Sequence, residues 1–154
     1  MLGRILNAKF LPTNTDVGLL LLRVGAGLTL FLRHGWEKVS TLSLINPHFP
    51  DPLHIGNNTT WTIALLSDGI CSLLIVLGVG TRWLSFFCFF NISVAWALVH
   101  HFTFLGKSPG ADHGELIVLY LWSFLTLMVA GPGRYSVDAA LLKEPEPAGR
   151  VVHV

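Results

Sequence analysis

Four runs of apolar residues dominate the pattern along the chain, and polar segments separate them. A transmembrane helix needs about 20 mostly apolar residues, because each residue rises about 1.5 Å and the hydrocarbon core of a bilayer is about 30 Å thick. Polar residues at the ends of the two shorter runs extend them into the headgroup region. We therefore expect an all-α membrane protein, a bundle of four transmembrane helices at about residues 17–34, 61–79, 84–102 and 114–131.

The composition supports this class and excludes others. Charged residues make up 12% of the 154 residues and apolar residues 52%, whereas a soluble domain is about 25% charged. A soluble fold of this length would have no sequence left to cover four such helices. The net charge of +1 gives no basic surface for nucleic acid. Cys71 and Cys88 lie inside apolar runs without CxxC spacing, which argues against a disulfide framework.

The positive charges favour one orientation. By the positive-inside rule, the loops richer in lysine and arginine lie in the cytoplasm. Six such residues fall on the side of the two termini and three on the opposite side. We therefore expect a multi-pass protein of the cytoplasmic (inner) membrane with both termini cytoplasmic. The six are Arg4, Lys9, Arg82, Arg134, Lys143 and Arg150, and the three are Arg33, Lys38 and Lys107.

Three segments flank the membrane domain, which we place at 16–135. Residues 1–15 have apolar positions at helical spacing with basic residues between them, which predicts a short amphipathic helix on the inner surface. The outer loop, about 39–60, contains three prolines and is expected to form a lid over the outer face. The tail, 136–154, is rich in proline and glutamate towards its end and is expected to be largely disordered.

Two charged residues lie inside predicted spans. Arg23 and Asp68 would each cost several kcal/mol alone in the bilayer, so such residues usually face the bundle interior and pair with one another. Their depths are similar enough for the long arginine side chain to bridge them. Two interpretations stay open and do not exclude each other: a structural ion pair, or a proton or ligand site built on the pair.

Helical projection at about 100° per residue gives each span an inward face. The face of the first span carries its buried charge and a glycine for close packing. Three such stripes together would enclose one polar cavity, with Arg23, Asp68, His34, Glu37 and Glu115 as candidate ligand or proton-site residues. The stripes are Arg23, Gly27, Leu30, His34 and Glu37; Trp61, Leu65, Asp68, Ser72 and Ile75; and Glu115, Leu119, Trp122 and Thr126.

Histidines gather on the predicted outer side. Imidazole together with carboxylate suits zinc, copper or iron, and histidine also transfers protons near neutral pH. Adjacent residues point about 100° apart on a helix, so only one of His100 and His101 is expected to face the cavity. A metal site, a polar ligand site and a set of solvated side chains all remain open. The candidate metal ligands are His34, His100, His101, His113 and Glu115.

Six motifs stand out along the chain: LLLLRVGAGL (19–28), HGWEK (34–38), FPDPLHIG (49–56), LGVGTRW (77–83), GEL (114–116) and GPGRYSVD (131–138). Together they resemble the DoxX family of small membrane proteins, and the resemblance covers about residues 16–140. The resemblance implies a four-helix bundle with Arg23 and Asp68 at family-typical positions, although members often carry glutamate in place of Asp68. It also implies a link to quinone-coupled electron transfer, because relatives include subunits of quinol oxidases and of thiosulfate:quinone oxidoreductases.

Three functions follow, in this order of preference. The first is a membrane subunit of a quinone-linked oxidoreductase, accessory to a redox-enzyme partner, whose polar cavity binds a quinone or similar ligand. The sequence contains no flavin, haem-attachment or iron–sulfur motif, so we do not expect a self-sufficient enzyme. The second is a metal or small-solute binding or transport protein that uses the outer histidines and, with only four spans, works as a homo-oligomer. The third is a membrane scaffold or assembly factor without chemistry of its own.

Overall fold

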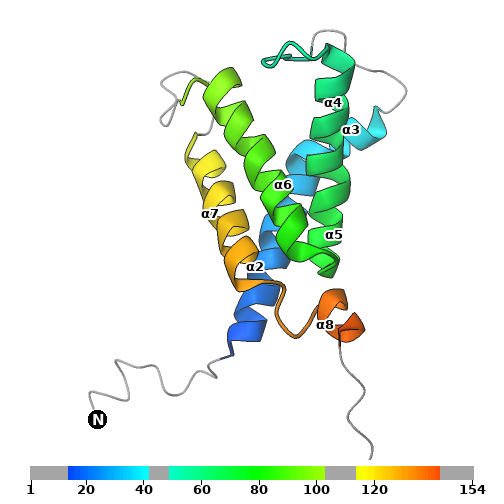
Figure 1. Ribbon diagram of the computed structural model, residues 1–154, viewed down its shortest axis with the longest axis vertical. Coiled ribbons are helices and arrows are strands. Elements are labelled where there is room, and N and C mark those ends of the chain that lie inside the picture. The colour runs from blue at the N-terminus through cyan, green and yellow to red at the C-terminus, as the bar shows by residue number, and fades with distance from the viewer. Residues whose placement is uncertain (1–13, 42–48, 103–113, 143–154) are drawn as a thin grey trace, which may run out of the picture.

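The computed structural model describes residues 14–41, 49–102 and 114–142, and every regular element in these ranges is a helix (Figure 1). The all-α class is confirmed for this part of the chain. Several predictions fall outside the described residues: almost all of the amphipathic segment 1–15, residues 42–48 of the outer loop, His113, and the tail beyond residue 142.

The first long helix runs from Thr15 to Ser40. It consists of α2 (Thr15–Leu30), a π-helical turn η1 (Phe31–Gly35) and α3 (Trp36–Ser40). Its first turn is capped by Asn14, whose side chain accepts hydrogen bonds from the backbone N–H groups of Asp16 and Val17. The helix is longer than the predicted span because the polar residues after position 34 stay helical.

The second and third long helices are joined by a tight turn. One consists of α4 (Asn57–Leu65), η2 (Leu66–Cys71) and α5 (Ser72–Leu77), and the other of α6 (Thr81–Val94) and η3 (Ala95–Val99). Gly78 and Gly80 in the turn have φ of 77° and 55°, which glycine adopts without a steric penalty. The Asp138 carboxylate accepts from the backbone N–H groups of Gly80 and Thr81 at 2.7 and 3.0 Å, and so caps α6.

The last two helices are α7 (Gly114–Ala130) and the short α8 (Val137–Leu141). The Ser136 hydroxyl accepts a hydrogen bond from the Ala139 N–H and caps α8. The sequence predicts a largely disordered tail from residue 136, but the cap makes the first residues of that tail helical.

The helices form one bundle in which α2 packs against α5 and α6 packs against α7. Its centre holds fully buried side chains such as Ile75, Phe124 and Leu127. The start of α2 and α8 lie at the same end (Figure 1), where the Arg134 N–H donates to the Asp16 carboxylate at 2.9 Å. We call this end the inner end and the opposite one the outer end.

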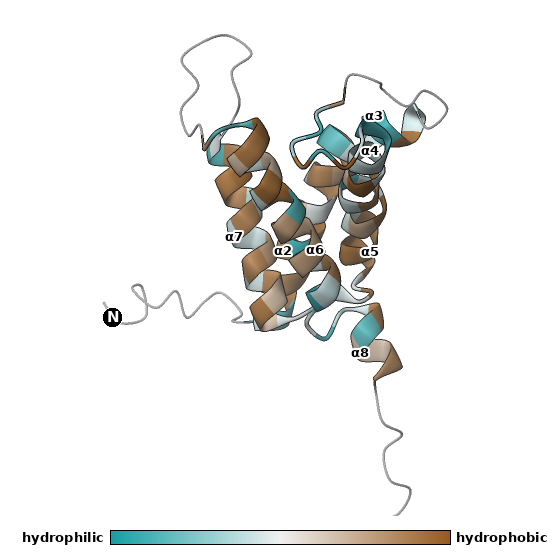
Figure 2. Cartoon of the chain, turned by 45° about the horizontal axis from the view of Figure 1, so that its top comes forward, coloured by the Kyte–Doolittle hydropathy of each residue, from teal (hydrophilic) through white to brown (hydrophobic). Residues whose placement is uncertain are grey.

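Apolar residues predominate along the helices, which are mostly brown in Figure 2, and many of the large apolar side chains are exposed. Three helices are long and apolar enough to cross a membrane, and α7, with 17 residues, is a shorter apolar helix. An exposed apolar surface of this extent is unfavourable in water and suits lipid. The chain is therefore a membrane protein. Its exposed large side chains include Leu21, Leu32, Leu77, Trp83, Phe90, Leu119, Trp122 and Val129.

The predicted inward faces differ in outcome. The stripe of the second span is confirmed, because all five of its residues are buried. The stripe of the fourth span is wrong, because Glu115, Leu119, Trp122 and Thr126 are all exposed. Lipid is as apolar as the bundle interior, so hydrophobicity alone does not distinguish the two faces of a transmembrane helix. The residues that α7 buries are Gly114, Tyr120, Phe124 and Leu127.

Candidate ligand pocket

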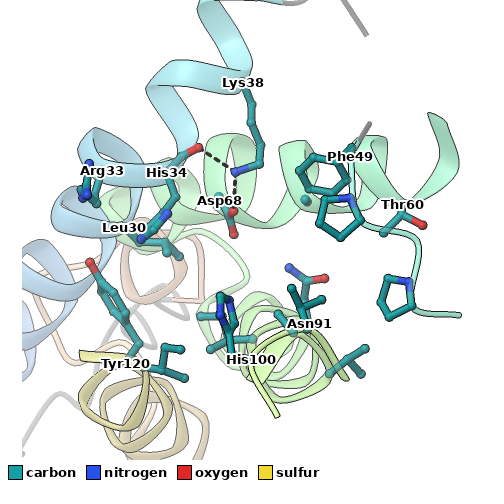
Figure 3. Close-up of a pocket in the computed structure, with 18 of the residues that line it drawn as sticks. Leu30, Arg33, His34, Lys38, Phe49, Thr60, Asp68, Asn91, His100 and Tyr120 are labelled. Atoms are coloured by element: carbon teal, nitrogen blue, oxygen red, sulfur yellow. Dashed lines mark hydrogen bonds and ion pairs between the residues drawn. The ribbon is translucent and has the colours of Figure 1, made fainter. Parts of the chain in front are cut away.

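A cavity of about 500 Å³ lies in the outer half of the bundle, between the four long helices and the loop before α4 (Figure 3). Most of its wall is apolar. Polar side chains enter it from α2–η1–α3, from α4–η2, from α6–η3 and from α7. They are Arg33, His34, Lys38, Thr60, Asp68, Asn91, His100 and Tyr120.

All three π-helical turns in the described part of the chain border this cavity. Turn η1 contributes Arg33 and His34, η2 contributes Asp68, and η3 contributes Ala95 and Val99. A π-turn is a local widening of an α-helix and is frequently found at functional sites. The coincidence of all three with one cavity therefore marks it as the candidate site.

Backbone contact between two of these turns fixes the position of Asp68. A Cβ atom on Gly35 would lie 2.3 Å from the Asp68 carbonyl oxygen and 3.0 Å from the Gly69 Cα. Only a glycine at position 35 lets the two helices approach this closely. The contact thus brings the backbones of the first and second helices together beside Asp68, at the wall of the cavity.

Asp68 forms an ion pair with Lys38, which the sequence analysis did not single out. Lys38 Nζ lies 3.0 Å from Asp68 Oδ2 and also donates to the His34 carbonyl at 2.9 Å. The two side chains are only 13% and 12% exposed. Each residue of a π-turn turns the helix by less than the α-helical value of about 100°. The side chains after η1 therefore point in different directions from those that an α-helical projection predicts. Lys38 therefore enters the cavity in place of the predicted Glu37, which is exposed.

Other polar side chains converge on the same space. Figure 3 shows His34 on one side of the cavity, His100 and Asn91 on the opposite side, and the Tyr120 hydroxyl directed towards Leu30 and His34. His100 lines the cavity, whereas His101 is exposed, which resolves the choice between them. The sequence analysis missed Asn91 and Tyr120 as site residues, although a polar or phenolic group within an apolar run was a usable signal.

The described part of the outer loop closes one side of the cavity with Phe49, Pro50 and Pro52. Asp51 holds this segment to the start of α4. Its carboxylate accepts hydrogen bonds from the Ile55 N–H at 3.0 Å, the Gly56 N–H at 2.8 Å and the Thr60 hydroxyl at 2.9 Å.

These bonds shift the acidity of Asp51. Desolvation raises the pKa of its carboxyl, but the hydrogen bonds from Gly56, Thr60 and Ile55 outweigh it and lower the pKa below its ordinary value. A lowered folded-state pKa gives a contribution to stability that is present above the ordinary carboxyl pKa of about 3.9 and is lost as the pH falls through the lower folded value.

We expect Asp51→Asn to loosen this loop. An amide has one acceptor oxygen, and its NH2 group cannot accept from Ile55 or Gly56. Hydrogen–deuterium exchange at the Ile55 and Gly56 amides should become several-fold faster, while Asn58→Ala, on the exposed first turn of α4, should leave it unchanged. In the wild type, protection of the two amides should stay constant from pH 7 to about 4 and fall below that. Unchanged protection in Asp51→Asn would contradict this role.

Arg23 lies away from the cavity, and the predicted ion pair between Arg23 and Asp68 is wrong. The Arg23 guanidinium donates to the backbone carbonyls of Pro132 and Tyr135 at the inner end. A helical side chain points back towards the N-terminus of its helix, so Arg23 on α2 reaches the inner end and not the level of Asp68. It fastens the segment between α7 and α8, which is a structural role.

The other predicted ligands do not gather. Glu37, Glu115 and His101 are exposed and none of them lines the cavity, and His113 lies outside the described residues. Within residues 14–41, 49–102 and 114–142, no group of three or more histidine, cysteine, aspartate or glutamate side chains is placed to hold a metal ion. His34 and His100 are the members of the predicted metal set that border the cavity.

Comparison with known proteins gives a family and one relative. The DoxX family model matches residues 18–101, which is more than half of the chain. A protein of Haemophilus influenzae is 28% identical over 140 residues, covering 89% of this chain and 91% of the relative, and is described as uncharacterized. No solved structure matches the chain.

Proposed function

This chain belongs to the DoxX family, and from that premise we propose that it is the membrane subunit of a quinone-linked oxidoreductase and that its outer cavity binds the quinone headgroup. A quinone is a flat apolar ring with carbonyl oxygens at opposite ends. A site for it needs apolar walls and hydrogen-bond donors on two facing sides.

The observation that carries this proposal is the placement of polar groups on opposite walls of one apolar cavity. His34 and Lys38 enter from the first helix, and Asn91 and His100 enter from the third (Figure 3). Tyr120 supplies a hydroxyl between them. Histidine, lysine, asparagine and tyrosine all carry donors for a carbonyl oxygen, and Asp68 holds the Lys38 ammonium in place.

A subunit role follows from what the sequence contains. It has no flavin, haem-attachment or iron–sulfur motif, so electrons would reach or leave the quinone through a partner protein. Such a partner would dock against the bundle or its ends, and the chain would supply the binding site within the membrane.

We further propose that all four helices cross the membrane and that both termini are cytoplasmic, in the inner membrane of the cell. Two observations support this topology. The start of α2 and the Arg134 segment meet at one end of the bundle, as an even number of crossings requires. Lysine and arginine are also more frequent in the segments at that end, in line with the positive-inside rule.

Adjacent histidines allow a matched test of quinone binding. His100 lines the cavity and His101 is exposed, so His100→Ala removes a group at the site and His101→Ala does not. We expect the affinity of the purified protein for short-chain ubiquinone to fall about fivefold in His100→Ala, since one hydrogen bond is worth about 1 kcal/mol. Equilibrium dialysis in detergent measures it. No detectable binding by the wild type, or equal affinities for both variants, would overturn the proposal.

A further inference from the structure

The outer cavity separates the second and third helices, which are in contact nearer the inner end. There α6 packs against α5 and η2, and the Cys88 thiol donates to the Ser67 carbonyl at 3.5 Å. About one turn further out, Asp68 and Asn91 line the cavity from the two helices. The helices therefore diverge from this level outwards, as α4 and α6 do in Figure 1.

The space between these two helices opens to the outside of the bundle. Each long helix packs against its neighbours in chain order, and α7 packs against α2, so the second and third helices share one outer edge of the bundle. At this edge neither α6 nor η3 packs closely against α4. Residues 91–97 are all partly exposed, and η3 has no buried residue. The cavity is therefore open between α4 and the α6–η3 segment. We call this opening, lined by Pro52, Ala64, Val94 and Ala95, the side opening.

The side opening lies within the depth of the bilayer. The second and third helices run antiparallel from the turn at Gly78–Gly80, and Ala64 and Val94 each lie 15 residues from Val79 in that turn, so they stand at about the same height. Val94 is about 20 Å along the helix from Thr81, where α6 begins, and the hydrocarbon core is about 30 Å thick. The side opening therefore faces lipid tails.

The two sides of the cavity differ in polarity. None of the four residues of the side opening has a polar side chain. On the opposite side, between the first helix and α7, the cavity is lined by the exposed guanidinium of Arg33 and by the phenol of Tyr120. An apolar chain that leaves the cavity is therefore better accommodated by the side opening.

We propose that the apolar tail of the ligand leaves the cavity through the side opening into the bilayer, so that the site takes a membrane-soluble, long-chain quinone directly from the lipid. This inference rests on the proposed function and adds the class of quinone and the side from which it enters. Lipid tails are as apolar as the protein interior, so a tail that extends into lipid loses no favourable surroundings. Its length is then not limited by the cavity of about 500 Å³.

The test is photolabelling of the purified full-length chain in lipid nanodiscs with a ubiquinone analogue whose decyl tail ends in a diazirine. Light converts the diazirine into a carbene, which inserts into the group that it touches, and mass spectrometry of peptides locates the label. We expect the label on α4 and on the α6–η3 segment. An excess of tail-less ubiquinone should remove most of it, because the bound headgroup holds the tail in place.

Two alanines of η3 give a matched pair of variants. Ala95 lines the cavity and Ala97 does not. Ala95→Phe should lower the label on α4 and α6–η3 about fivefold or more, because a ring in a narrow opening excludes the tail, while Ala97→Phe should leave it unchanged. Tail-less ubiquinone should bind to folded Ala95→Phe as it does to the wild type, since the polar groups of the cavity are untouched. The location of the label in the wild type tests the proposal even if Ala95→Phe does not fold.

Label on α2 or α7 instead would place the tail on the opposite side and overturn the proposal. So would label that excess tail-less ubiquinone does not reduce, because the probe would then lie against the helices as ordinary lipid does, or equal labelling of the two variants. If tail-less ubiquinone binds to the wild type and depends on His100 while the label is misplaced, the proposed function stands and the side opening is wrong. If no ubiquinone binds, both are wrong.

Discussion

Gly35→Ala should unfold or severely loosen the bundle. The new Cβ would lie 2.3 Å from the Asp68 carbonyl oxygen and 2.8 Å from its carbon. Both are backbone atoms of a helix, so no rotamer change relieves the overlap and the first and second helices must separate. Overpacking of a rigid site costs about 1–3 kcal/mol and sometimes more, and we expect this one to lower the free energy of unfolding by more than about 3 kcal/mol. Reversible unfolding by SDS in mixed micelles measures it.

The control is Gly25→Ala in the same helix. A Cβ at position 25 would meet no atom within 4 Å, and alanine favours the helix over glycine by about 0.5–1 kcal/mol. Gly25→Ala should therefore be neutral or slightly stabilising. Equal stabilities for the two variants would show that the helices do not approach each other as closely at Gly35 as the structure places them.

Much of the fold could be predicted from the order of apolar and polar residues. The length of an apolar run is related to the thickness of the bilayer, and the three helices long enough to cross a membrane, together with the shorter α7, lie where the runs are. The inward stripe of the second span was predictable because Asp68 and Ser72 break its apolar pattern, and polar groups in a membrane face the interior. On α7, by contrast, Tyr120 is the only inward polar side chain in the middle of the helix, and the pattern gave the wrong face.

The site was harder to predict because the pattern of apolar and polar residues does not indicate where a helix contains a π-turn. After turn η1, Lys38 lines the cavity and Glu37 lies outside it. A helical projection at a constant angle of about 100° per residue predicts the opposite placement of these two residues. The partner of Arg23 was missed for a different reason. The similar depths of Arg23 and Asp68 in the membrane suggested Asp68 as the partner. A guanidinium group can also donate its hydrogen bonds to backbone carbonyl oxygens, here those of Pro132 and Tyr135. These two residues are more than 100 positions away in the chain, so the sequence pattern did not indicate them.

The second large effect is expected from breaking the ion pair between Lys38 and Asp68. Asp68→Asn leaves the Lys38 ammonium without its counter-charge in a site where the side chains are only 13% and 12% exposed. Removal of one partner of a buried pair typically costs about 3–5 kcal/mol, because the remaining charge is uncompensated. We expect about 3 kcal/mol here, measured by SDS unfolding, since the long lysine side chain can extend part of the way towards water. Glu37→Gln, an exposed neutralisation one residue from Lys38, should change stability by less than about 0.5 kcal/mol.

The double variant Lys38→Met with Asp68→Asn distinguishes a purely structural role of the ion pair from a role in ligand binding. With both charges gone, no uncompensated charge remains, so stability should return to within about 1 kcal/mol of the wild type, and the double-mutant cycle should give a coupling of about 2 kcal/mol or more. If the pair serves only to hold the helices, the restored protein also binds short-chain ubiquinone normally. The proposed site requires the opposite: a stable protein whose affinity stays several-fold lower, because the Lys38 donor is lost from the cavity wall. Additive destabilisation by the two substitutions would instead show that Lys38 and Asp68 are not partners.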